Sequence, residues 1–221
     1  MVAETRAISV LRILRQTIAL PILTKSKRNP FETLIVTILS QNTADRNTVR
    51  AFENLSKQFE ITPEALANAE INQIEVCIRS AGLCKAKAKT IKHVSKVLLD
   101  DFHGTLTPIL VLPLEEARAV LTHFRGVGPK TADVVLLFSA RQPTIPVDTH
   151  VNRVAKRLRF TPANSNYETV RKNLQQLYKP HDFLAVHVLL IAHGRKYCKA
   201  KHPLCAQCPV NAYCPSKGLW D

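Results

Sequence analysis

Two residues eighteen positions apart, Lys130 and Asp148, have side chains suited to covalent and acid–base chemistry. Lys130 follows the turn Gly126-Val127-Gly128-Pro129 at the start of a predicted helix. The positive end of a helix and partial burial both disfavour the ammonium form of a lysine, and the free amine is a nucleophile. Asp148 precedes another predicted helix, Val151–Arg159, where its carboxylate can stabilise positive charge or transfer protons. Taken singly, Lys130 would more commonly be a surface lysine and Asp148 a helix cap.

Four of the six cysteines lie close together, with the spacing Cys198-x6-Cys205-x2-Cys208-x5-Cys214. We expect no secretion signal, so a metal site is favoured over a disulfide framework. By chemistry alone, four thiolates suit a [4Fe–4S] cluster and a zinc ion equally well. Prolines directly after Cys208 and Cys214 favour a cluster loop weakly, and the single Cys-x-x-Cys unit is unusual for zinc. We interpret the two isolated cysteines, Cys77 and Cys84, as ordinary small residues.

Apolar residues recur every three or four positions through most of the chain, which predicts an all-α fold. Representative stripes are Phe31, Leu34, Ile35, Ile38 and Leu39; Ile91, Val94, Val97 and Leu98; and Leu114, Ala117, Val120 and Leu121. Asn29-Pro30 and Thr62-Pro63 predict capped helix starts, whereas Gly104 and Gly194 predict helix ends.

Gly126 and Gly128 lie between predicted helices at about 113–124 and 130–140, in a chain with only six glycines. A helix–turn–helix of this kind directs backbone amides and a positive helix end toward an anion. The anion could be a nucleic-acid phosphate. The simpler alternative is that this segment is a plain helix–helix turn without a ligand. Further on, Arg141–Pro146 is the best candidate for a crossing between domains.

The 31 Lys and Arg residues exceed the 17 Asp and Glu residues, which gives a net charge of +14. Such an excess predicts a polyanionic partner, either nucleic acid or an anionic membrane surface. No apolar run is long enough to span a membrane. Each basic tract alone would be a solvated helix face, but together they favour nucleic acid. These tracts are Lys85, Lys87, Lys89, Lys92 and Lys96; Arg153, Lys156, Arg157 and Arg159; and Arg195, Lys196, Lys199 and Lys201.

The first residues form a basic, acid-poor stretch whose composition would also suit an organellar presequence. Its apolar residues Ile8, Leu11, Leu14 and Ile18 repeat at helical spacing. The repeat favours an N-terminal helix docked on the rest of the protein.

Two longer strings resemble the endonuclease III family of DNA glycosylases: Phe124-Arg125-Gly126-Val127-Gly128-Pro129-Lys130-Thr131-Ala132-Asp133, and Thr144-Ile145-Pro146-Val147-Asp148-Thr149-His150-Val151-Asn152-Arg153-Val154. The resemblance runs from about residue 30 to 214 and implies that the first string is a helix-hairpin-helix. It implies that Lys130 is the nucleophile and Asp148 the other essential catalytic group. It also implies that Cys198, Cys205, Cys208 and Cys214 hold a [4Fe–4S] cluster.

The same resemblance implies a set of DNA-contacting residues: Gly126, Val127, Gly128, Asn42, Leu83, His150, Arg153, Lys199 and Lys201. Leu39–Asp45 and Gly82–Lys87 resemble family loops that probe the duplex, with Leu83 as the wedge that fills the gap left by an extruded nucleotide. Asn42 stands where bacterial relatives usually carry a glutamine facing the orphaned base. This departure leaves the preferred opposite base open.

The implied fold has two all-α lobes, a six-helix bundle over residues 31–142 and a cluster lobe formed by 1–30 with 143–221, with the catalytic cleft between them. The implied function is removal of oxidised or ring-saturated pyrimidines from double-stranded DNA and cleavage of abasic sites by β-elimination. We expect a monomer that works where DNA is, is not secreted and has no membrane partner. The alternatives are a monofunctional adenine or mismatch glycosylase, which lacks such a lysine, a non-catalytic DNA-binding module with zinc, and an electron-transfer protein.

Overall fold

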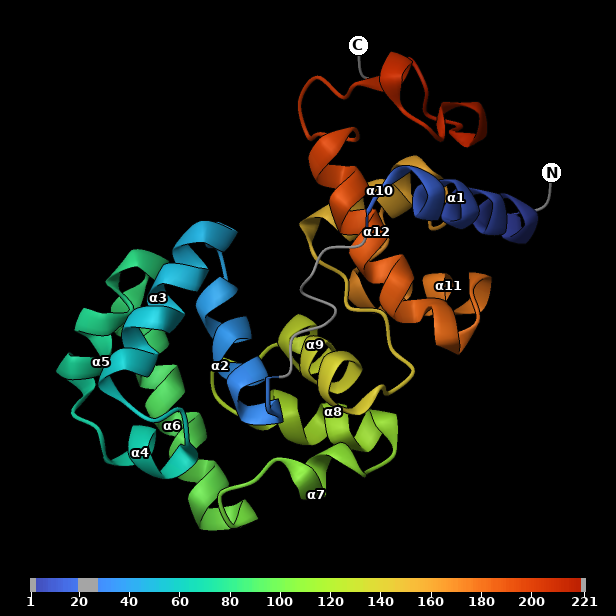
Figure 1. Ribbon diagram of the computed structural model, residues 1–221. Helices are drawn as coiled ribbons and strands as arrows, with labels where there is room; N and C mark the ends of the chain where they lie inside the picture. The colour runs from blue at the N-terminus through green and yellow to red at the C-terminus, as the bar shows by residue number, and fades with distance from the viewer. Residues whose placement is uncertain (1–2, 20–27, 220–221) are drawn as a thin grey trace. The chain divides into compact units, whose positions relative to one another are not determined.

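The computed structural model describes residues 3–19 and 28–219, and within these residues all regular secondary structure is helical (Figure 1). No strand occurs in this part of the chain, so the predicted all-α class is confirmed. Among the same residues, no helix is both long enough and apolar enough to cross a membrane.

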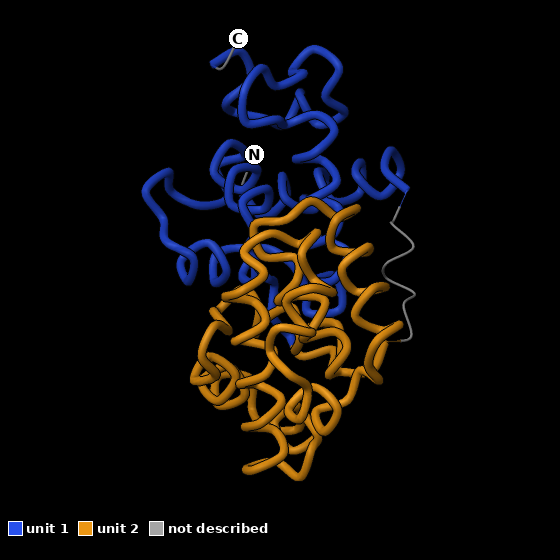
Figure 2. Tube along the Cα trace, turned by 90° about the vertical axis from the view of Figure 1, so that its left-hand side faces the viewer, with its two compact units in different colours: residues 1–26, 143–221 blue, residues 27–142 orange. Residues whose placement is uncertain are grey.

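The described chain forms two compact units (Figure 2). The unit of residues 28–142 contains α2 (Pro30–Ser40), α3 (Asp45–Gln58), α4 (Pro63–Asn68), α5 (Ile71–Cys77), η2 (Arg79–Ala81), α6 (Cys84–Phe102), α7 (Thr107–Leu110), α8 (Leu114–His123) and α9 (Pro129–Ala140). The unit of residues 3–19 and 143–219 contains α1 (Ala3–Thr17), α10 (Thr149–Arg157), α11 (Tyr167–Leu177), η3 (Pro180–Asp182), α12 (Phe183–Lys196), η4 (Cys205–Gln207) and η5 (Asn211–Tyr213). We call these the hairpin unit and the cysteine unit. Residues 20–27, between α1 and α2, lie outside the described residues.

Helices α2, α6 and α9 supply much of the core of the hairpin unit. Their inward faces are fully buried, which removes apolar surface from water and fixes the helix ends that carry the loops. The buried side chains include Leu34, Ile35, Ile38 and Leu39 of α2, Ile91, Val94 and Leu98 of α6, and Ala132, Val135 and Leu136 of α9.

Local capping sets where several helices begin and end. The side chain of Asn29 accepts a hydrogen bond from the Glu32 amide at 2.8 Å, and the Glu32 carboxylate accepts one from the Asn29 amide at 3.0 Å. Thr62 caps α4 through its hydroxyl, so both predicted starts are confirmed. Gly104 is also confirmed as a stop: α6 ends at Phe102, and Gly104 has a φ of +73°.

The N-terminal helix α1 packs on α11 and α12, which confirms a docked helix. Its buried face consists of Ala7, Val10, Leu11 and Leu14. Ile8 was predicted on this face, but its side chain is 56% exposed. Successive helical residues are about 100° apart, so a stripe through Ala7 and Leu11 leaves Ile8 outside it.

Gly194 lies inside α12, which continues to Lys196, so its predicted role as a helix end is wrong. A Cβ atom at Gly194 would lie 2.9 Å from Cβ of His150 and 3.3 Å from Cγ2 of Val154. The glycine therefore allows α12 and α10 to approach each other closely.

Candidate active site and cluster loop

The helix-hairpin-helix consists of α8, the turn Phe124–Gly128 and α9. Gly126 has a φ of +88°, and a Cβ atom there would lie 2.3 Å from Oγ1 of Thr90 on α6. Val127 packs its side chain into the core and donates its amide hydrogen to the Phe124 carbonyl at 2.9 Å. Gly126 is thus required both by its backbone conformation and by the close approach of α6.

Gly128 has a different role, because nothing within 4 Å would meet a Cβ atom there and its backbone is extended. It is the N-cap of α9 and provides no capping side chain for the first-turn amides. Lys130 lies in this first turn and is half-buried. The hairpin therefore offers a positive helix end with unobstructed backbone, which suits a phosphate group.

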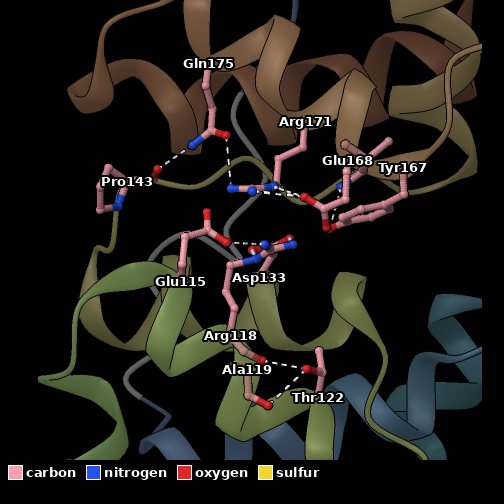
Figure 3. Close-up of polar contacts among 11 residues, drawn as sticks. Glu115, Arg118, Ala119, Thr122, Asp133, Pro143, Tyr167, Glu168, Arg171 and Gln175 are labelled. Carbon is pink, nitrogen blue, oxygen red and sulfur yellow. Dashed lines mark hydrogen bonds and ion pairs between the residues drawn. The ribbon is translucent and has the colours of Figure 1, made fainter.

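A buried ion pair joins the two helices of the hairpin (Figure 3). Nε of Arg118 on α8 donates to Oδ1 of Asp133 on α9 at 2.8 Å, and the Asp133 side chain is fully buried. Arg118 also contacts Glu115, with 2.6 Å between Nη1 and Oε2. Asp133 lies three residues after Lys130, so the pair fixes α8 against the turn of α9 that follows the lysine. No local pattern in the sequence predicts this pair.

Asn42 and Leu83 lie in two loops of the hairpin unit, Gln41–Ala44 and Ala81–Leu83, which we call the probe loops. Both residues have left-handed backbone, with φ of +52° and +49°. Both are exposed, and the Leu83 side chain remains 64% accessible. A left-handed conformation costs a leucine about 1–2 kcal/mol, whereas asparagine adopts it more readily, so the surrounding structure must hold Leu83 in particular.

Lys87 lies beneath both probe loops and is only 3% exposed. Its ammonium donates hydrogen bonds to the Leu39 carbonyl at 2.7 Å, the Thr43 hydroxyl at 2.7 Å and the Ala81 carbonyl at 2.9 Å. The Thr43 hydroxyl also hydrogen-bonds to the Ala81 carbonyl. Burial lowers the pKa of Lys87.

The sequence placed Lys87 in a surface tract of positive charge, and this interpretation is wrong because all three bonds are internal. A signal was present: Lys87 lies four residues before Ile91 and continues the apolar stripe of Ile91, Val94 and Leu98. A lysine on the buried face of a helix needs internal acceptors for its ammonium.

Gln41 connects the first probe loop to the hairpin. Its Nε2 donates to the Gly126 carbonyl at 3.1 Å and to Oγ1 of Thr131 at 3.2 Å. Together with Lys87, this side chain joins the two probe loops and the hairpin into one hydrogen-bonded network within the hairpin unit.

In the cysteine unit, Asp148 is the N-cap of α10, and its Oδ1 accepts the Val151 amide hydrogen at 2.7 Å. Its other oxygen, Oδ2, accepts no hydrogen bond from the described residues. The preceding segment is anchored by Gln175, whose Nε2 donates to the Pro143 carbonyl at 2.6 Å (Figure 3). The helix-cap role of Asp148 thus leaves one carboxylate oxygen for other chemistry.

Arg153 connects α10 to the end of α12. Its Nε donates to the Cys198 carbonyl at 2.9 Å and its Nη2 to the Gly194 carbonyl at 3.0 Å. Nη2 also lies 3.0 Å from Nδ1 of His150, one turn earlier on α10. Arg153 and His150 are therefore adjacent side chains, and both are half-buried.

The four C-terminal cysteines line a single pocket, together with residues such as Arg157 and His193. None of the four forms a disulfide. Burial, and to a smaller degree the nearby thiolates of Cys214, Cys198 and Cys205, raise the pKa of Cys208 to about 11. Neighbouring thiolates repel one another, and bound metal cations would remove this repulsion. The four converging thiols therefore suit a metal centre. Among the described residues, no set of three or more potential ligands is arranged for a single metal ion.

Arg157 anchors the loop that leads into this pocket. It is 8% exposed and donates to the Lys199 carbonyl at 2.6 Å, the Ala200 carbonyl at 3.1 Å and Sγ of Cys198 at 3.5 Å. Its predicted membership of a surface basic tract is therefore wrong. By contrast, the side chains of Lys199 and Lys201 are exposed.

The sequence matches two family models. Residues 35–180 match the HhH-GPD superfamily of base excision DNA repair proteins, and residues 198–214 match the iron-sulfur binding domain of endonuclease III. The chain belongs to the HhH-GPD superfamily.

Several relatives of this HhH-GPD protein carry the name endonuclease III. That of Sulfolobus acidocaldarius is 41% identical over 85% of this chain and 82% of its own length. That of Escherichia coli is 32% identical over 99% of both chains. Among solved structures, a trapped endonuclease III–DNA covalent intermediate has a TM-score of 0.86 and 30% identity, and covers 98% of both chains.

These matches confirm the predicted family, its fold and its enzyme class, a DNA N-glycosylase and abasic-site lyase. The HhH-GPD protein is a base-excision repair enzyme that binds DNA and has a [4Fe–4S] cluster as its cofactor. A thermostable thymine-DNA glycosylase, at 18% identity and a TM-score of 0.75, shares the fold.

Proposed function

We propose that this enzyme removes oxidised or ring-saturated pyrimidines, such as thymine glycol, from duplex DNA and then cleaves the abasic strand by β-elimination. The observation that carries the proposal is the half-buried Lys130 in the first turn of α9, directly after a hairpin without a capping side chain. The likeness to an endonuclease III trapped on DNA as a covalent intermediate supports a covalent step.

In the proposed reaction, the free amine of Lys130 attacks the sugar C1′ while the glycosidic bond breaks and the base leaves with a proton. Loss of a proton from nitrogen and opening of the sugar ring give the Schiff base. A proton then leaves C2′, the C3′–oxygen bond breaks, and the 3′ phosphate departs. Asp148 stabilises positive charge on the sugar and assists the proton transfers through the oxygen that does not cap α10. Water finally hydrolyses the imine and frees Lys130.

We assign the backbone of Gly126, Val127 and Gly128 to a DNA phosphate, with Gly128 as the point of closest approach. Leu83 enters the stack as the wedge, and Asn42 faces the orphaned base. Lys199 and Lys201 contact phosphates through exposed ammonium groups. His150 and Arg153, side by side on α10, form a further contact to the DNA backbone. The enzyme acts as a monomer on damaged duplex or on abasic sites, in the compartment that holds the DNA.

We assign Cys198, Cys205, Cys208 and Cys214 as the ligands of the cluster. The bound cluster would supply no step of this reaction and would cross-link the loop that carries Lys199 and Lys201. Arg157 and Arg153 would hold the same loop through backbone carbonyls.

Borohydride trapping on a duplex with one thymine glycol tests this proposal. The wild type should give a covalent protein–DNA adduct, and Lys130→Gln should give none because it has no amine to form the imine. Lys57→Gln, which removes an exposed lysine of α3, should trap like the wild type.

Release of the base by the wild type without any adduct would mean a monofunctional glycosylase and would overturn the role of Lys130. An adduct that persists in Lys130→Gln would place the nucleophile elsewhere. If wild type traps an abasic duplex but ignores thymine glycol, the lesion class is wrong while the lyase step holds.

A further inference from the structure

We propose that Lys87 is a positioning residue that holds the two probe loops at a fixed spacing for extrusion of the damaged nucleotide. This inference rests on the proposed function, because it concerns how that reaction obtains its substrate base. Lys87 itself is buried and contacts neither the base nor the sugar.

The three hydrogen bonds of Lys87 reach three separate parts of the hairpin unit. Leu39 is in the last turn of α2, Thr43 is in the first probe loop, and Ala81 begins the second. An ammonium group has three donors, and here each has its own acceptor. The planar, longer guanidinium of an arginine cannot reproduce these three directions from the same Cα position.

The place of Lys87 on α6 would suit an apolar residue, as far as packing alone is concerned. It continues the buried stripe of Ile91, Val94 and Leu98, and no described carboxylate pairs with its ammonium. Taking an ammonium out of water is unfavourable, and its lowered pKa reflects this. A methionine would pack along the same stripe without that penalty, but it would leave the Leu39 carbonyl, the Thr43 hydroxyl and the Ala81 carbonyl without this donor. We therefore attribute the presence of an ammonium at this position to the hydrogen bonds that it donates to the acceptors of the loops.

Those acceptors lie beside the two probes, Asn42 and Leu83. Asn42 immediately precedes Thr43, and Leu83 follows Ala81 by two residues. Both probes have a positive φ, and Leu83, which tolerates this conformation less well than Asn42, would leave it if the second loop were released. Gln41 connects the first loop to the Gly126 carbonyl of the hairpin. The ammonium of Lys87 thus sets the distance between Leu83, the wedge, and Asn42, which faces the orphaned base. The Gln41 hydrogen bond fixes the position of Asn42 relative to the hairpin turn.

The test compares a substrate that requires extrusion with one that does not. The first is thymine glycol in a duplex, and the second is an abasic site in single-stranded DNA, whose sugar is already accessible. Lys87→Met should lower single-turnover excision from the duplex about tenfold or more, since small misplacements of positioning groups have effects of this order. Cleavage of the single-stranded abasic site should stay within about threefold.

Two further variants keep the test decisive. Thr43→Val removes the hydroxyl shared by Lys87 and Ala81 but keeps the ammonium, so it should shift the ratio of the two rates in the same direction by a smaller factor. Val94→Ala truncates a fully buried side chain on the same face of α6 and should leave the ratio unchanged, although it destabilises the fold.

An unchanged ratio in both Lys87→Met and Thr43→Val would overturn the inference. An equal change in Val94→Ala would also overturn it, because stability alone would then explain the effect. Fluorescence of 2-aminopurine opposite the lesion reports unstacking without chemistry and should rise less on binding of Lys87→Met than of wild type. If the wild type neither excises thymine glycol nor forms a trapped adduct, the proposed function fails. The difference in fluorescence between wild type and Lys87→Met still tests whether Lys87 positions the probe loops.

Discussion

A Cβ atom at Gly126 would lie 2.3 Å from Oγ1 of Thr90, so the hairpin turn rests directly on α6. The same helix begins next to Leu83 and carries Lys87 beneath the probe loops. One helix therefore supports both the turn to which we assign a DNA phosphate and the loops that would open the duplex.

The two hairpin glycines should respond differently to substitution. Gly126→Ala combines a positive φ with a collision and should lower the free energy of unfolding by about 2 kcal/mol or more. Gly128→Ser should keep wild-type stability, because its Cβ meets nothing and serine is a good N-cap. The serine side chain should nevertheless weaken binding to an abasic-site analogue in duplex DNA. Urea unfolding and DNA titrations check both, and wild-type DNA affinity in Gly128→Ser would contradict the phosphate assignment.

Substitutions at Asp148 should separate its two roles. Asp148→Asn retains a capping side chain and Asp148→Ala does not, so their unfolding free energies should differ by about 1 kcal/mol. Both should lose excision of thymine glycol to a similar extent, because neither has a carboxylate. Single-turnover kinetics measure the excision rate of each variant, and thermal unfolding measures its stability. Activity that follows stability instead would mean that Asp148 acts only as a cap.

If Lys199 and Lys201 of the cluster loop contact DNA phosphates, their removal should weaken the salt dependence of DNA binding. Lys199→Ala and Lys201→Ala should each reduce the slope of log affinity against log salt by about 1, as expected for the loss of one phosphate contact. Lys57→Ala on α3 serves as the charge-matched control and should keep the wild-type slope. Equal slopes in all three variants would remove these lysines from the interface.

Arg157 should control how firmly the cluster is retained. Arg157→Met removes the bonds to the Lys199 and Ala200 carbonyls and to Sγ of Cys198, so the loop should open more readily. We expect a chelator to bleach the visible absorbance of the variant several times faster than that of wild type. Lys172→Met, an exposed change on α11, should bleach at the wild-type rate. Unchanged bleaching in Arg157→Met would show that the cysteines alone hold the loop.

Tyr178 should make the fold sensitive to alkali. Burial, and to a smaller degree the charge of Asp182, raise the pKa of Tyr178 well above the ordinary value of about 10. The unfolded chain then loses a proton that the folded protein keeps, so stability is intact below about pH 10 and falls as the pH rises beyond it. Tyr178→Phe should abolish this loss, worth about 1.4 kcal/mol one unit above pH 10. Urea unfolding at about pH 8 and pH 11 measures the difference, and parallel losses in both proteins would contradict it.

The sequence predicted those parts of the fold that depend on local patterns. Apolar periodicity identified the helices, and the side chains of Asn29 and Thr62 identified two of their starts. It could not predict that Gly194 lies where two helices meet, because that contact involves residues far apart in the chain.

For the candidate site, the resemblance of two strings to the endonuclease III family singled out Lys130 and Asp148, and residue type and spacing singled out the four cysteines. The same reasoning put Lys87 and Arg157 on the surface, because a charged side chain is normally solvated. Both are buried, and backbone carbonyls far away in the sequence or on another element accept their hydrogen bonds: those of Leu39 and Ala81 for Lys87, and those of Lys199 and Ala200 for Arg157. Such contacts depend on tertiary structure, and periodicity of apolar residues does not record them.

The left-handed backbone at Asn42 and Leu83 has a consequence for attempts to redirect the enzyme toward other lesions. Asparagine tolerates this conformation well, whereas β-branched residues tolerate it poorly. In a library randomised at these two positions, the valine, isoleucine and threonine variants would therefore distort the loops and would not report on altered recognition. Restricting the library to asparagine, aspartate, glycine, histidine and unbranched side chains would let selection act on contacts to DNA.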